Sequence, residues 1–381
     1  MKILVVGDLQ ILCEDSGGIR AEQTRGTLSW VLGVLDQYKP DAMVHLGDYG
    51  EDNRGVDHYS LTLMTWFMSE TFKRVEKSWW LVGNHDFCTE DGSVNLMTAL
   101  QPLMPENHHV PWPWSTGPEG TMFVSYLNKD GKENFRVESG MVFAEKEKTV
   151  LFSHLPVNGA MFSPHRFEEG GIDPTWLPHQ TIVGHYHRPN PPDPALAAFG
   201  NAIWYAGSPM SHDFRDNCYD LTPAQQLRGI WLFDIEKGEV VAPPVFIENP
   251  AAVYYLSFAA DLDAAGVVQD DWFTKHCVLP LDRTVLKLTV PPGKEEQATA
   301  IFDQTTKAST ILRSDQHVSA TVEESVQVIN PDATPAQAVT EYVAGLPPEK
   351  LSGLDPAVLE KTGVDLVQDG YSLPEGAADG C

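Results

Sequence analysis

The chain has 381 residues, a hydrophobic content of 42% and a formal net charge of −27 at pH 7. Because proteins that grip duplex DNA through its phosphates usually present a basic face, this acidity argues against strong DNA binding by the chain alone. Its five cysteines form no Cys-x-x-Cys pair, which argues against a disulfide framework and for a reducing compartment. No apolar run approaches the roughly 20 residues of a membrane helix, so we expect a soluble, cytoplasmic protein.

Five apolar, β-branched runs predict buried strands, and polar residues follow each run at once. The runs are Ile3–Val6, Met43–Leu46, Trp79–Val82, Thr149–Phe152 and Thr181–Val183. The clusters that follow are Gly7-Asp8-Leu9-Gln10, Gly47-Asp48-Tyr49, Gly83-Asn84-His85-Asp86, Ser153-His154 and Gly184-His185-Tyr186-His187. We therefore expect these clusters on loops at one sheet edge.

The residue types in the clusters predict a two-metal phosphoesterase site. Phosphodiester hydrolysis needs a hydroxide at neutral pH and charge neutralisation on the phosphoryl oxygens, which two metal ions about 3.5–4 Å apart supply. Asp48 is the natural bridge, because the two oxygens of its carboxylate can each bind one ion. The mixed imidazole and amide ligands suit Mn²⁺, Fe²⁺ or Zn²⁺ better than Ca²⁺ or Mg²⁺.

The order Asp-x-His, Gly-Asp, Gly-Asn-His-Asp, His and Gly-His-x-His resembles the signature of calcineurin-like metallophosphoesterases, and the chain follows it over residues 1–188 with one departure. The resemblance implies a fold of α/β class, a four-layer α-β-β-α sandwich, with Mn²⁺ as the first choice of metal. It implies His85 as general acid, with Asp86 steadying the loop or the imidazole. It assigns the first metal to Asp8, Gln10, Asp48 and His187, and the second to Asp48, Asn84, His154 and His185.

The departure from the signature is Gln10, where most relatives carry His. A glutamine carbonyl can coordinate a metal, but it is a neutral and weaker donor than imidazole. We therefore expect the first metal to bind more loosely or to be a different ion. One alternative follows from this residue, a scaffold subunit with an impaired first metal site.

Three later stretches resemble SbcD-type nucleases and extend the likeness to about residue 248. They are Tyr205-Ala206-Gly207-Ser208-Pro209, Phe214-Arg215-Asp216 and Arg228-Gly229-Ile230-Trp231-Leu232. The resemblance implies a nuclease domain over 1–250. Residues 251–330 are predicted to form a strand, a second strand at Thr284–Val290, a helix at Lys294–Ser309 and a strand at His317–Val322, which is similar in size and order to the capping domain of those nucleases. Residues 331–381 are expected to hold two short helices, Thr334–Gly345 and Asp355–Thr362, which bind a partner, and then a disordered acidic end.

These features together predict a metal-dependent DNA exonuclease or endonuclease that acts with an SbcC-like coiled-coil ATPase in recombination and repair. The resemblance also implies a homodimer, for which the apolar stretch Thr62–Phe72 is a candidate surface and equally a candidate piece of core. Candidate local contacts to DNA are Arg20, Arg25, Arg54, Arg188 and Arg215. The other alternative is a phosphodiesterase or phosphatase for small phosphoesters, which would explain the acidity.

Overall fold

The computed structural model describes residues 1–12, 19–51, 55–128, 148–163, 166–189, 202–212, 226–259, 283–290 and 313–318, and eight single residues at 131, 337, 340, 343, 344, 358, 361 and 364. The chain divides into two compact units, Met1–Val318 and Ser319–Cys381. The predicted domain limits at residues 250 and 330 stay predictions. Apart from its single described residues, the predicted helical segment 331–381 lies outside the described residues.

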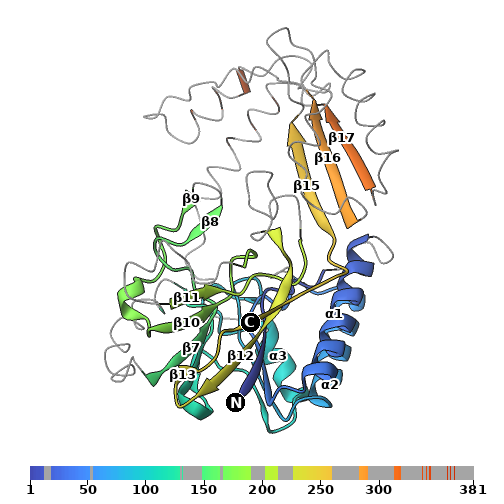
Figure 1. Cartoon of the computed structure of the whole chain (residues 1–381). Helices are drawn as coiled ribbons and strands as arrows, with labels where there is room; N and C mark the ends of the chain where they lie inside the picture. The colour runs from blue at the N-terminus through green and yellow to red at the C-terminus, as the bar shows by residue number, and fades with distance from the viewer. Residues whose placement is uncertain are drawn as a thin grey trace, which may run out of the picture. The chain divides into compact units, whose positions relative to one another are not determined.

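The first sheet has seven strands in the order β13-β12-β1-β2-β3-β4, with β14 beside β12. Its strands β12 and β13 are labelled in Figure 1, near the N-terminus. Its strands are β1 (Lys2–Val6), β2 (Ala42–His45), β3 (Lys77–Trp80), β4 (His108–His109), β12 (Gly229–Glu236), β13 (Glu239–Val240) and β14 (Val245–Glu248). The strands β1 to β4 run parallel, and β12 runs antiparallel to β1. The carboxyl ends of β1, β2 and β3 therefore lie side by side.

The second sheet has five strands in the order β11-β10-β7-β6-β5. They are β5 (Trp114–Thr116), β6 (Thr121–Val124), β7 (Val150–Ser153), β10 (Gln180–Val183) and β11 (Ala202–Tyr205). All neighbours are parallel except the antiparallel pair β5 and β6. The carboxyl ends of β7, β10 and β11 consequently also meet at one edge.

The two sheets pack face to face because their strands alternate in side-chain direction. In β1, Ile3 and Val5 join the core between the sheets, whereas Leu4 and Val6 face the opposite side. The inter-sheet core includes stacked rings from both sheets, with the ring centroids of Trp79 and Phe123 4.6 Å apart. This packing confirms the predicted α/β sandwich.

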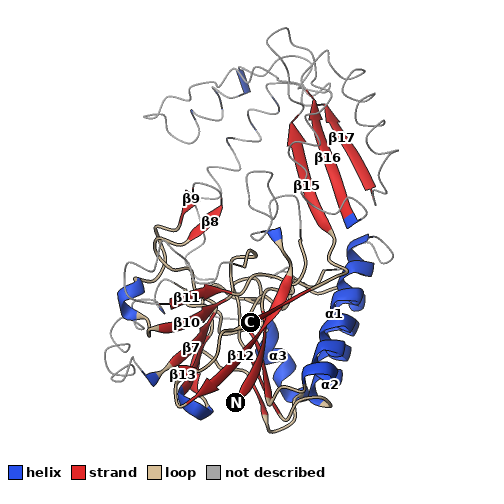
Figure 2. Ribbon diagram, viewed as in Figure 1, coloured by secondary structure: helices blue, strands red, loops and turns tan. Residues whose placement is uncertain are grey.

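Helices cover the outer face of the first sheet (Figure 2). They are α1 (Ile19–Tyr38), α2 (His58–Phe72) and the short α3 (Leu96–Leu100). The Asp57 carboxylate caps α2, accepting hydrogen bonds from the backbone N–H groups of Tyr59 and Ser60. Met64, Phe67 and Met68 of α2 are buried in this core, so most of the apolar residues that suggested a dimer surface pack inside the protomer. The homodimer stays a prediction.

The remaining strands are short or lie beyond the sandwich. The pair β8 (Met161–Ser163) and β9 (Arg166–Phe167) is antiparallel, and β15 (Tyr254–Ala259), β16 (Thr284–Val290) and β17 (Arg313–Val318) form a parallel three-stranded sheet. The strand predicted at Thr284–Val290 is confirmed, and the one predicted at His317–Val322 begins earlier, at Arg313. The predicted helix Lys294–Ser309 lies outside the described residues. No described helix is long and apolar enough to cross a bilayer.

Candidate metal centre

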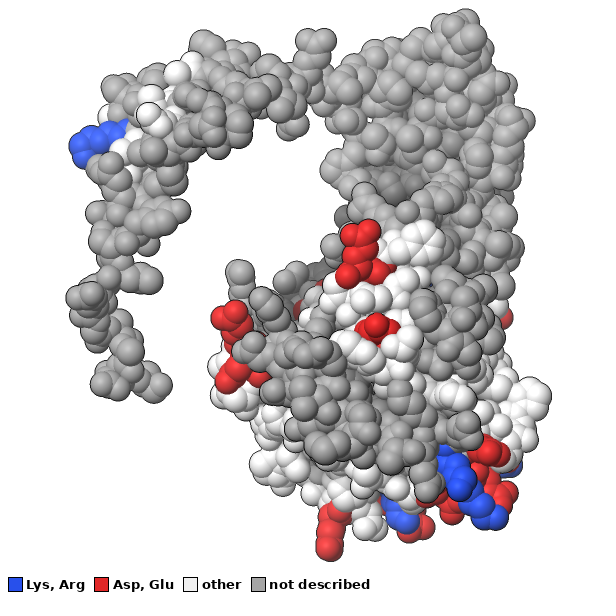
Figure 3. All heavy atoms as spheres, turned by 90° about the vertical axis from the view of Figure 1, so that its left-hand side faces the viewer, with Lys and Arg blue, Asp and Glu red and all other residues white. Residues whose placement is uncertain are grey.

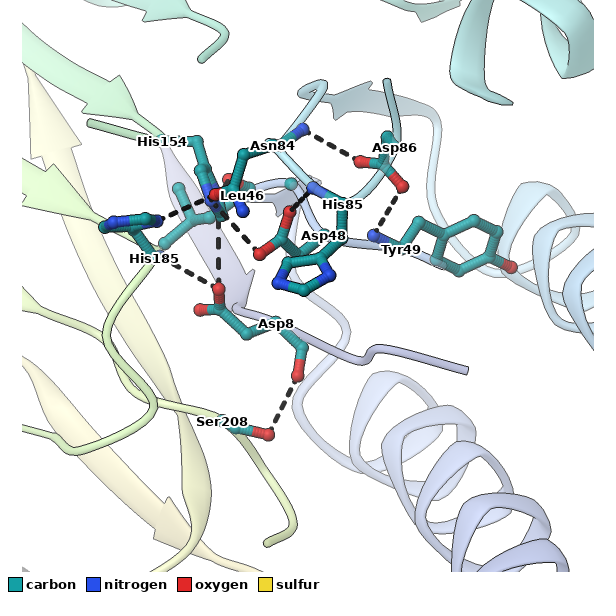
Figure 4. Close-up of polar contacts among 12 residues, drawn as sticks. Asp8, Leu46, Asp48, Tyr49, Asn84, His85, Asp86, His154, His185 and Ser208 are labelled. Atoms are coloured by element: carbon teal, nitrogen blue, oxygen red, sulfur yellow. Dashed lines mark hydrogen bonds and ion pairs between the residues drawn. The ribbon is translucent and has the colours of Figure 1, made fainter. Parts of the chain in front are cut away.

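The predicted clusters converge at the carboxyl ends of the parallel strands of both sheets (Figure 4). Loops after β1, β2 and β3 bring Asp8, Asp48 and the Asn84 cluster from the first sheet. Loops after β7 and β10 bring His154 and His185 from the second sheet. The carboxyl edge of parallel strands is where α/β proteins usually bind ligands, because loops from several strands meet there.

The second-metal group, Asp48, Asn84, His154 and His185, is already in mutual contact. Nε2 of His154 lies 3.3 Å from Oδ2 of Asp48 and 3.1 Å from Oδ1 of Asn84. Nδ1 of His185 lies 2.8 Å from the same Asn84 oxygen. One donor atom each from Asp48, His154 and His185 lies within 4.8 Å of the other two, so these side chains are grouped closely enough to be candidate ligands of one metal ion.

A backbone carbonyl fixes which ring nitrogen of His154 faces the candidate metal ligands. Its Nδ1 lies 2.8 Å from the carbonyl oxygen of Leu46. Because a carbonyl only accepts, Nδ1 carries the hydrogen and Nε2 faces the other candidate ligands. Metal-binding histidines are commonly oriented in this way by a backbone carbonyl.

The first-metal group, Asp8, Gln10, Asp48 and His187, contains two buried oxygens that no described residue satisfies. Oδ1 of Asp8 accepts a hydrogen bond of 2.9 Å from the backbone N–H of His185. Oδ2 of Asp8 and Oε1 of Gln10 are buried and have no hydrogen-bond partner among the described residues. Since buried polar atoms without partners are rare and costly, these two oxygens fit a metal ion as their missing partner.

A buried polar layer supports the first-metal group, and the individual roles of its members were not predictable from the sequence. Ser208 Oγ donates to the carbonyl oxygen of Asp8 at 2.8 Å, and Nε2 of His212 lies 2.9 Å from the same oxygen. Arg228 is fully buried, and its Nη1 donates to the carbonyl oxygen of His187 at 3.1 Å. Ser208 and Arg228 lie in the stretches that resemble SbcD-type nucleases, whereas no pattern in the sequence pointed to His212.

Four candidate ligands hold a left-handed backbone. The φ angles are 32° at Asp8, 40° at Gln10, 53° at Asp48 and 80° at His185. Non-glycine residues rarely adopt this region, and such strain concentrates at functional sites. The loops therefore fold in a strained form that turns these side chains toward the centre of the site.

Gly83 is required by the close approach of the Asp48 loop. A Cβ atom at this position would lie 2.1 Å from Oδ1 of Asp48 and 2.2 Å from its backbone nitrogen. Even alanine would therefore displace the predicted bridging carboxylate. The glycine before Asn84 thus belongs to the site for steric reasons.

His85 and Asp86 have different surroundings. The His85 backbone N–H donates to Oδ1 of Asp48 at 2.8 Å, and its Nδ1 lies 2.7 Å from the carbonyl oxygen of Glu51. Asp86 instead accepts from the backbone N–H groups of Tyr49, Gly50 and Gly83 at 2.9, 3.0 and 2.8 Å. Of the two roles expected for Asp86, these contacts favour steadying the loops over steadying the imidazole.

Burial and charge shift the pKa values of the metal-free centre in opposite directions. Burial lowers the pKa of His154, but the charge of Asp48 and the hydrogen bond to it prevail and raise that pKa to about 9. Burial opposes ionisation of Asp48, yet the charge of His154 and their hydrogen bond hold its pKa below the ordinary value. Burial raises the pKa of Asp8 to about 6, against the charges of His154 and His187. Burial and the charge of His154 lower the pKa of His185 to about 3.

A family profile described as calcineurin-like phosphoesterase matches residues 1–221 of the chain. The chain belongs to the calcineurin-like phosphoesterases. Members of this family are metal-dependent hydrolases with dinuclear divalent metal sites, and the donor set described above fits such a pair of ions. The assignment of individual residues as ligands stays a prediction.

Two proteins of known structure resemble this calcineurin-like phosphoesterase distantly. The protein TT1561 of Thermus thermophilus is 9% identical, covers 54% of this chain and 89% of its own, and gives a TM-score of 0.35. A dimetal phosphatase from Danio rerio is 12% identical, covers 65% of this chain and 98% of its own, and gives a TM-score of 0.37. No curated protein matches the chain.

Proposed function

We propose that this calcineurin-like phosphoesterase is a DNA nuclease of SbcD type that cleaves phosphodiester bonds with two divalent ions, Mn²⁺ being the first choice. The observation that carries hydrolysis is the second-metal group in mutual contact beside His85, together with the unpaired buried oxygens of Asp8 and Gln10. The backbone N–H of Gln10 donates to the carbonyl oxygen of Asp48 at 2.8 Å. The choice of DNA rests on the SbcD-like stretches. Two of their residues, Ser208 and Arg228, hold backbone carbonyls of the site.

The side chains divide the work of hydrolysis. Asp8, Gln10, Asp48, Asn84, His154, His185 and His187 would hold the ions. Bound ions supply an activated water and neutralise charge on the phosphoryl oxygens. His85 protonates the leaving oxygen from Nε2 as the P–O bond breaks and that oxygen takes the bonding electron pair. Asp86 keeps the loops of Asp48 and His85 in register.

The distribution of charged side chains supports a proposal in which a partner protein helps to bind DNA. The described Lys and Arg side chains of residues 1–318 gather at the lower edge of the face in Figure 3, while described Asp and Glu side chains are spread across it. Of the predicted DNA contacts, Arg25 is exposed on α1, whereas Arg54 and Arg215 lie outside the described residues. An SbcC-like coiled-coil ATPase in the cytoplasm would therefore supply much of the grip on DNA to a homodimer of this chain.

The net charge of −27 favours a second candidate function, hydrolysis of small phosphoesters. A small monoanionic ester needs no extended basic face, because its charge is met at the metal centre. This candidate leaves the SbcD-like stretches without a function. The scaffold alternative predicts one bound ion per chain where either enzyme needs two.

The decisive experiment measures Mn²⁺-dependent cleavage of end-labelled single- and double-stranded DNA beside hydrolysis of bis-nitrophenyl phosphate. The Asp48→Ala variant removes the predicted bridge, and the Glu90→Ala variant removes an exposed carboxylate as the matched control. Cleavage of DNA by the wild type and the control but not by Asp48→Ala supports the nuclease. Hydrolysis of bis-nitrophenyl phosphate without cleavage of DNA supports the second candidate. No activity on either substrate, with one bound ion per chain, supports the scaffold.

A further inference from the structure

Arg20 joins three loops of the site through one side chain. It lies in the first turn of α1, and its Nη2 donates to the carbonyl oxygen of Gln10 at 3.2 Å and to Oε2 of Glu51 at 3.0 Å. Its Nη1 donates to the carbonyl oxygen of His212 at 3.1 Å. A guanidinium can do this because its donors form a rigid planar fork, which a lysine ammonium lacks.

The contact with Glu51 leads directly to the predicted general acid. The carbonyl oxygen of Glu51 lies 2.7 Å from Nδ1 of His85. Because a carbonyl only accepts, Nδ1 carries a hydrogen, and the proton given to the leaving oxygen must depart from Nε2. The position of Glu51 therefore decides where Nε2 of His85 points.

The Arg20–Glu51 ion pair is shielded enough to hold that position. The side chains of Arg20 and Glu51 are only 21% and 22% exposed, so water screens the pair less than it screens a surface pair. A backbone bridge between Ile11 and Gly50 ties the same loop to the Gln10 loop. Arg20 thus fastens the Glu51 loop at the residue next to this bridge.

We propose that Arg20 is a positioning residue that acts through Glu51 to aim the His85 imidazole at the leaving oxygen. The inference rests on the proposed phosphodiesterase function. It replaces the expectation that Arg20 contacts DNA phosphates, because the described structure directs its guanidinium to internal acceptors. Arg20 itself touches no reacting atom.

The test compares two phosphodiesters that differ in their need for an acid. Nitrophenolate leaves without a proton, whereas the alkoxide released from a thymidine dinucleotide needs one. In Arg20→Met we expect kcat for the dinucleotide to fall about 100-fold, since small misplacement of a catalytic group costs about this much. We expect kcat for bis-nitrophenyl phosphate to change less than about threefold, because release of nitrophenolate does not need the general acid. Two Mn²⁺ ions should still bind.

Three further variants complete the design. Arg74→Met is the matched control, since Arg74 also pairs with carboxylates, those of Glu70 and Asp36, and should leave both esters unaffected. Arg20→Lys keeps the positive charge but loses the planar guanidinium, so it should recover part of kcat on the dinucleotide. This variant can be tested even if Arg20→Met fails to fold. Adding Arg20→Met to His85→Ala should cause no further loss on the dinucleotide, because both act on one step.

Several results would overturn the inference while leaving the phosphodiesterase intact. Equal losses on both esters, a raised KM with unchanged kcat, or full activity of Arg20→Met on the dinucleotide would each do so. Additive losses in the double variant would also contradict it. Failure of the wild type on both esters would instead remove the proposed function.

Discussion

The two groups of candidate metal ligands differ in how far their side chains already contact one another in the metal-free structure. In the second-metal group, Asn84 and Asp48 already contact the His154 imidazole, so charge and hydrogen bonds hold the ligands together. In the first-metal group, Oδ2 of Asp8 and Oε1 of Gln10 are buried without a partner among the described residues. An ion bound at the first group would give these two oxygens a partner, whereas an ion bound at the second group would have to displace the proton of His154.

The largest expected effect falls on a residue outside both groups. Replacing His85 with alanine should lower kcat on DNA about 10²–10⁴-fold, the usual contribution of a general acid. Both ions should still bind, because no candidate ligand atom is removed. Rapid-quench cleavage assays with metal analysis check this, and loss of an ion from His85→Ala would move His85 into the ligand set.

A pH titration should separate the two groups. His154, whose pKa is about 9 without metal, is protonated at neutral pH, so an ion must displace its proton to bind. Affinity of the second-metal group should then rise about tenfold per pH unit from pH 7 toward 9. Asp8, with a pKa of about 6, has already lost its proton there, so the first-metal group should change little.

Mn²⁺ titration calorimetry in buffers of different ionisation enthalpy measures this proton release. One proton released at pH 7 and none well above about pH 9 is the expected result. Equal pH dependence of the two binding steps would show that the groups do not differ in this respect.

The Asp86→Asn variant tests whether the second-metal group is held by its loops. Asparagine offers an N–H group to backbone donors that need an acceptor, so unfolding free energy should fall by about 1–3 kcal/mol. Urea unfolding measures the change. Asp41→Asn is the control, because Asp41 accepts from the backbone N–H of Lys2 at the exposed surface. Equal losses in both variants would remove the special role of Asp86.

The smallest effect should come from restoring the usual ligand in the first-metal group. Imidazole is a stronger donor than an amide oxygen, so Gln10→His should tighten the first ion up to about tenfold, or about 1.4 kcal/mol. Competition with a metal-sensitive dye measures this affinity, with the exposed Gln101→His as control. Unchanged affinity and rate would place Gln10 outside the coordination shell.

The sequence predicted the strands and their polar endings because both depend on local pattern. Apolar runs locate β1, β2, β3, β7 and β10, and parallel strands bring their carboxyl ends together without further information. The contacts that organise these loops could not be predicted in the same way. Arg20 meets His212 across 192 positions of the chain, and only the folded structure reveals this contact.

Residue type left the interpretation open where one side chain has several uses. Arg20 was predicted as a candidate contact to DNA, and only the structure shows that its guanidinium donates to internal acceptors. The apolar residues of Thr62–Phe72 fitted both a core and a dimer surface, and burial of Met64 and Phe67 decides for the core at those positions. Charge and hydrophobicity identify what a side chain can do, whereas its neighbours select among the possibilities.

The left-handed backbone of Asp8, Gln10, Asp48 and His185 bears on how long the protein stays folded. Each such residue costs about 1–3 kcal/mol, which glycine would avoid, but glycine offers no ligand atom. Ions that bind only the folded chain return that free energy to a degree that grows with their concentration. The concentration of metal ions would therefore affect how well the chain resists unfolding and proteolysis, as well as how fast it hydrolyses its substrate.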